Sequence, residues 1–149
     1  MAGSLSYSAS LRFSLALLAL SFAGPAAALS PAGVAEDFLN KIESGNTVEA
    51  FGMLTASAKR GRSAADMKAP PRQPDLIRRV AFQGPIDPNE AGQQDPGKYF
   101  IVCMIDVPQG SGAVTNIAVT VAADPDSSQL RIADYRYDSH PAPACASRM

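Results

Sequence analysis

"YFIVCMIDV", residues 99–107, carries the strongest strand pattern of the chain, with aromatic and β-branched residues following one another between turn-forming segments. Three other segments alternate with a period of two, at residues 75–86, 113–123 and 129–138. Short connections rich in Pro, Gly, Ser and Asp join the last three strands. Such connections favour neighbouring antiparallel strands, so the sequence predicts a four-stranded antiparallel meander.

The alternation is clearest in "AVTNIAVTVAA", residues 113–123, where Ile117, Val119 and Val121 point to one face of the sheet. The polar and small residues between them point to the other face. One face of the sheet is therefore expected to pack on helices, and the other to be less apolar.

Residues 75–86, "DLIRRVAFQGPI", show the same period less cleanly. Counting alternate positions places Arg78, Val80 and Phe82 on one face, with Ile77 and its alternating neighbours on the other. This segment ends at a Gly-Pro pair, which is a turn signal.

Two helices are expected before the strands. Ser30 can cap a helix that has proline at its first position, and apolar residues then recur at helical spacing up to a stop at Gly45. The spacing predicts helices over 31–44 and 47–59, which form an N-terminal helical hairpin against a curved sheet. Helices followed by strands define an α+β class.

The segment from residue 59 to residue 79 is basic, with seven Lys or Arg and two Asp, a local charge of +5. Residues 59–74 form a predicted loop with one helical turn near 63–67. Such a charge can attract an anionic partner, although a solvated loop with ordinary surface charge is the alternative. The candidate anion-binding residues are Lys59, Arg60, Arg62, Arg78 and Arg79.

Residues 1–28 have the layout of a secretory signal peptide, with one arginine, an apolar run from 13 to 23 and a small-residue cleavage site. Cleavage after Ala28 leaves a single α+β domain at 29–139 and a C-terminal tail at 140–149. The alternative is an uncleaved N-terminal anchor. We expect a periplasmic or extracellular protein with no membrane span after cleavage. Its balanced, slightly acidic composition gives no support for nucleic-acid binding.

The chain has two cysteines, Cys103 and Cys145. Export favours a disulfide, which would close a loop of about 43 residues and stabilise the fold by about 4 kcal/mol on the chain-entropy model. Cys103 alternates with Ile101 and Ile105, so it can instead point into the core, out of reach of a surface tail. Pairing of Cys145 with another protein is the third alternative.

An enzyme built on this fold needs a carboxylate in an apolar pocket, and Asp106 and Asp134 are the best-placed candidates. Tyr99, Tyr135 and Tyr137 are candidate hydroxyl donors. In the alternative interpretation Asp106 begins a turn, and Asp134 faces solvent and pairs with Arg131 or Arg136. His140 is the only histidine, and no ligand spacing around it predicts a metal site.

The segments "VAEDFLNKIESGNTVEAFGMLT" (34–55) and "LRIADYRY" (130–137) carry a resemblance to a known fold family. The chain resembles the cystatin-like folds of the nuclear-transport-factor-2-like superfamily, and in particular small exported bacterial domains with no assigned function. The resemblance implies a conical pocket between a curved sheet and the helices. The superfamily includes isomerases, dehydratases and binding domains, and none of their catalytic motifs matches this chain residue by residue.

The sequence thus predicts an exported domain that binds an envelope protein or a small ligand in the cone between sheet and helices, without catalysis or cofactor. The alternative is a cystatin-like lyase or isomerase that uses a buried carboxylate, Asp106 or Asp134. Pairing of two copies through the open sheet face, which gives a homodimer, is a further expectation.

Overall fold

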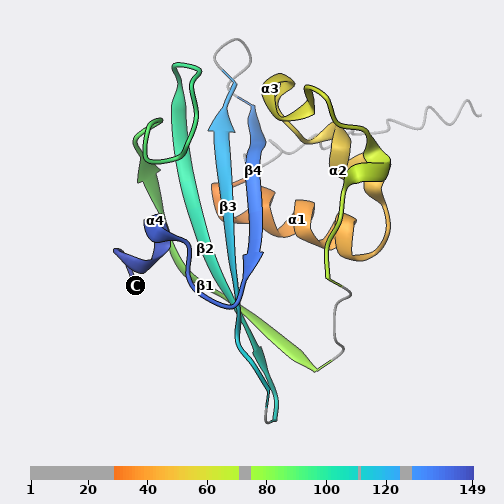
Figure 1. The fold of residues 1–149 in the computed structure, drawn as a ribbon, viewed down its shortest axis with the longest axis vertical. Helices are drawn as coiled ribbons and strands as arrows, with labels where there is room; N and C mark the ends of the chain where they lie inside the picture. The colour runs from red at the N-terminus through yellow and green to blue at the C-terminus, as the bar shows by residue number, and fades with distance from the viewer. Residues whose placement is uncertain (1–28, 71–74, 111, 125–128) are drawn as a thin grey trace, which may run out of the picture.

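Four antiparallel strands form the centre of the molecule (Figure 1). The computed structural model describes residues 29–70, 75–110, 112–124 and 129–149, so the expected signal peptide lies outside the described residues. The strands pair in the order of the sequence and are β1 (Leu76–Ile86), β2 (Lys98–Pro108), β3 (Thr115–Ala123) and β4 (Leu130–Asp138). The predicted meander and the α+β class are confirmed.

Helix α1 (Pro31–Glu43) crosses one face of the sheet, behind the strands in Figure 1. The hydroxyl of Ser30 accepts a hydrogen bond from the Gly33 amide at 3.1 Å, which satisfies a free N–H of the first turn as the sequence predicts. The helix ends one residue before the predicted end. Gly45 follows with a φ of 83°, the left-handed conformation in which glycine ends helices.

The predicted helix over 47–59 is wrong as one continuous element. The structure has a short α2 (Thr47–Gly52) and a single turn of α3 (Ala56–Lys59), separated by three residues. Within this break, the carbonyl of Met53 accepts from the Ile132 amide and the amide of Thr55 donates to the Ile132 carbonyl, both at 2.9 Å. The break therefore satisfies backbone groups at the edge of β4 that a continuous helix would leave unpaired.

A β-bulge in β1 corrects the predicted facing of residues 75–86. Val80 lies opposite Met104, but Phe82 lies opposite Cys103, so Ala81 is an extra residue in the ladder. Arg78 and Val80 consequently face the helices, whereas Phe82 packs on the other face.

The sheet is apolar on both faces. Phe38, Leu39, Leu54, Met104 and Ile132 lead the core on the helix side, where each is at most 1% exposed. The opposite face, here called the outer face, packs against the 87–97 loop and against the C-terminal tail with its short helix α4 (Pro143–Ala146). The predicted turn near 63–67 is a 3-10 helix, η1 (Ala64–Asp66). None of the helices in the described part of the chain is long and apolar enough to cross a membrane.

Candidate functional site

The two predicted catalytic aspartates lie on opposite faces of the sheet. Asp106 lies within β2, not at a turn, and faces the helices, where its two oxygens accept from Arg78 at 2.8 and 2.7 Å. Asp134 lies half-buried on the outer face and accepts from Arg136 Nε at 3.1 Å. Pairing of Asp134 with Arg136 is thus confirmed. Arg78 thus engages both oxygens of Asp106 inside the core, whereas Asp134 borders two hollows of the outer face.

Asp106 belongs to a buried polar cluster that ties the end of α1 to β1, β2 and β4. Arg78 Nη2 donates to Glu43 Oε1 at 2.6 Å, and the hydroxyl of Tyr137 donates to the same oxygen at 3.0 Å. The side chains of Arg78, Glu43 and Asp106 are 11%, 4% and 6% exposed. Burial alone would lower the pKa of Arg78, but hydrogen bonds to the two carboxylates outweigh it and raise the pKa. Arg78 is therefore a structural residue.

Replacing Tyr137 with phenylalanine should lower the free energy of unfolding by about 1–2 kcal/mol at neutral pH, because Glu43 loses a buried donor. Burial raises the pKa of Tyr137, and the charge of Glu43 raises it further. Because the folded-state pKa of Tyr137 lies above the unfolded-state value of about 10, the free energy of unfolding falls as the pH rises above that value. The fall is at most about 1.4 kcal/mol per pH unit. Urea unfolding at a series of alkaline pH values should show a steeper loss for the wild type than for Tyr137→Phe. Equal slopes would contradict this assignment.

Hollows lie side by side on the outer face, with volumes of about 600, 320, 180 and 70 Å³. The 600 and 320 Å³ hollows share Ser57 and Gln93, and Arg136 lines the 320, 180 and 70 Å³ hollows. Their floor is made of small residues of the sheet, namely Ala118, Thr120, Ala122 and Ala133. We call this row of hollows the outer groove. The space between α1 and the sheet, by contrast, is filled by the core side chains.

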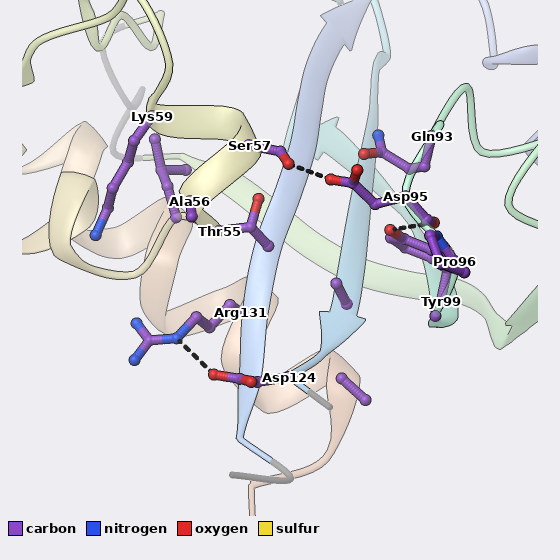
Figure 2. A pocket seen from close by; sticks show the side chains of 14 residues that line it. Thr55, Ala56, Ser57, Lys59, Gln93, Asp95, Pro96, Tyr99, Asp124 and Arg131 are labelled. Atoms are coloured by element: carbon purple, nitrogen blue, oxygen red, sulfur yellow. Dashed lines mark hydrogen bonds and ion pairs between the residues drawn. The ribbon is translucent and has the colours of Figure 1, made fainter. Parts of the chain in front are cut away.

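The largest hollow lies between α3 and the 87–97 loop (Figure 2). Ser57 points across it and donates to the carboxylate of Asp95. Tyr99 donates to the Asp95 carbonyl at 3.0 Å, and burial raises the pKa of this tyrosine, so its hydroxyl stays protonated. Arg131 and Asp124 form an ion pair of 3.7 Å at the far end. The hollow thus offers hydrogen-bond donors and acceptors beside the apolar surface of the sheet.

The structure separates the five predicted anion-binding residues. Arg78 is buried in the polar cluster, and Arg79 is exposed on β1 away from the groove. Lys59 lines the largest hollow, but its ammonium donates to the Gly52 carbonyl at 3.2 Å. Arg60 and Arg62 line the 320 Å³ hollow together. Of the predicted set, these two are brought together in the outer groove.

The C-terminal tail forms one wall of the outer groove. The sulfur atoms of Cys103 and Cys145 lie at disulfide distance, with their Cα atoms 5.7 Å apart. Cys103 is buried, as its alternation with Ile101 indicates, but it faces the tail and not the helices. Arg148 adds an ion pair of 2.6 Å with Glu90 of the loop. The tail thus covers part of the face through which the sequence predicts homodimerisation, and the homodimer stays a prediction.

Sequence reasoning missed the residues that shape the groove. Ser57 belongs to α3, Gln93 and Asp95 to a loop rich in turn formers, and Arg136 to the last strand. No spacing rule joins such positions, and only the basic character of the 59–79 segment indicated this region. His140 is exposed, and within the described ranges no group of His, Cys, Asp and Glu could hold a metal ion.

Comparison with known proteins gives no relative from which a role could be transferred. No family model, curated protein or solved structure matches the chain.

Proposed function

We propose that this chain is a small exported domain that binds a small ligand in the outer groove, without catalysis. The observation that carries the proposal is the 600 Å³ hollow between α3 and the 87–97 loop, which falls within the volumes of small-molecule sites. Its polar groups come from both walls, and the apolar surface of Ala122 and Tyr99 lies between them. A ligand in the cone between helices and sheet has less support, because core side chains fill that space.

Export to an oxidising compartment, the periplasm or the cell exterior, is part of this proposal. It is supported by the signal-like residues 1–28 and by the cysteine pair at disulfide distance. The cystatin-like fold with an N-terminal helical hairpin is also a proposal, supported by the order of helices before an antiparallel meander.

Filling the largest hollow should weaken ligand binding strongly. Ala56 is an exposed residue of α3 that lines the hollow, so Ala56→Trp places an indole there with little effect on the fold. In a ¹⁹F NMR screen of small fluorinated aromatic compounds, we expect several compounds to bind the wild type and to bind the variant at least about tenfold more weakly.

Ala65→Trp is the matched control, since Ala65 is exposed on η1 and does not line the groove. Compounds that bind the wild type should bind this control equally well. The proposed site is wrong if no compound binds, or if the two tryptophan variants behave alike.

A further inference from the structure

Three arginines converge on one hollow of the outer groove. Arg60 and Arg62 follow α3 in the sequence, Arg136 projects from β4, and together they line the 320 Å³ hollow. Asp134 is the one acidic residue in its lining. Its lining therefore carries three positive charges against one negative, although the whole chain has a formal charge of −1, and Asp95 lies beside it as the ion-pair partner of Arg60.

The internal contacts of these arginines leave most of their donors free. Within the described part of the chain the Arg62 side chain makes no hydrogen bond or ion pair, although Asp66 is close enough to feel its charge. Arg60 uses Nη2 toward Ser57 at 2.6 Å and Asp95 at 3.6 Å, and Arg136 uses Nε toward Asp134. A guanidinium carries five N–H donors, so each arginine keeps donors for a ligand. The two ion pairs also help to orient Arg60 and Arg136.

We propose that Arg60, Arg62 and Arg136 bind a tetrahedral oxyanion, such as a phosphate or sulfate group, carried by the ligand of the adjoining hollow. A carboxylate offers two oxygens and one charge, which one guanidinium can satisfy, whereas a tetrahedral oxyanion can accept from several guanidinium groups at once. Ser57 and Gln93 line both hollows, so one ligand can extend from the arginines into the larger space. This inference rests on the proposed function and adds the chemical class of the ligand.

The test is a titration of the full chain with inorganic phosphate at constant ionic strength, followed by the NMR signals of the arginine side chains. Arg62→Gln should weaken phosphate binding by about tenfold, because it removes a charge-assisted donor. Arg79→Gln is the matched control, since Arg79 is exposed on β1 and lies outside the hollow. Acetate at the same ionic strength should bind more weakly than phosphate.

Two results would overturn the oxyanion site. One is a phosphate titration that shifts the signals of Arg60, Arg62 and Arg136 no more than that of Arg79. The other is an equal effect of Arg62→Gln and Arg79→Gln on the phosphate dissociation constant.

Phenyl phosphate separates failure of this inference from failure of the proposed function. If both hold, phenyl phosphate binds more tightly than phosphate, and Ala56→Trp removes that advantage while phosphate still binds. If phosphate binding depends on Arg62 but phenyl phosphate binds no more tightly than phosphate, the oxyanion site is supported and the larger ligand site is contradicted. If neutral compounds bind and Ala56→Trp weakens their binding, but the protein does not bind phosphate, the oxyanion site is wrong and the proposed function stands.

Discussion

Arg78→Met should lower the free energy of unfolding by about 3–5 kcal/mol, because it strands the carboxylates of Glu43 and Asp106 in the core. Both carboxylates are at least nine-tenths buried, and Arg78 is the positively charged partner that the structure shows for each of them. Methionine fills most of the space of the arginine stem, so the loss measures the missing charge more than a cavity. Urea unfolding followed by circular dichroism gives the difference.

The neighbouring Arg79→Met is the control, since Arg79 is exposed on the same strand, and its effect should stay within about 0.5 kcal/mol. Replacing Glu43 and Asp106 with leucine in the Arg78→Met variant should recover much of the stability, because well-packed apolar residues can replace a buried ion cluster. Equal stability of the two arginine variants would contradict the structural role of Arg78.

Local sequence pattern predicted the strands because each of them carries its own period. The alternation of Ile117, Val119 and Val121 with small and polar residues fixes which face of β3 meets the helices, and the antiparallel pairing with β4 follows from the small number of residues between the two strands. Helix α1 was equally predictable, since Ser30 and Gly45 mark its two ends.

The break between α2 and α3 and the bulge at Ala81 depend on distant partners. Met53 and Thr55 leave the helix to hydrogen-bond Ile132, a residue almost 80 positions later, and Thr55 then caps α3 through the Ala58 amide. The helical spacing over 47–59 gives no indication of this contact with Ile132. The bulge similarly moves Phe82 to the outer face, where the tail and the 87–97 loop bury part of it.

The outer groove was unpredictable for the same reason. Ser57, Gln93 and Arg136 meet only because α3, a long loop and β4 converge at one side of the sheet. Charge counting indicated the 59–79 segment, but it could not distinguish Arg62, which lines the groove, from Arg78, whose charge is neutralised in the core. The charges along a segment thus indicate a candidate binding region, but the tertiary contacts decide which of its side chains remain available to a ligand.

Reduction of the cysteine pair should lower the free energy of unfolding by about 4 kcal/mol, the chain-entropy value for closing the loop between Cys103 and Cys145. The tail should then leave the outer face more often, because it keeps the Arg148 to Glu90 ion pair, the contact of Arg148 with the Phe82 ring and small apolar contacts, but no covalent link. Hydrogen exchange of the Cys145 amide, which donates to the Ala142 carbonyl, should accelerate on reduction. Urea unfolding with and without a reductant measures the stability change.

The double variant Cys103→Ala, Cys145→Ala separates the bond from other effects of the reductant. Its free energy of unfolding should equal that of the reduced wild type, apart from a small loss from the cavities that the Cys→Ala changes leave. Reductant should not change its unfolding. The unreduced wild type should have a mass two hydrogens below that of the dithiol and should resist thiol labelling. Two thiols that label in the unreduced protein would contradict the bridge, and the tail wall of the outer groove would then be held by packing and by the Arg148 to Glu90 ion pair.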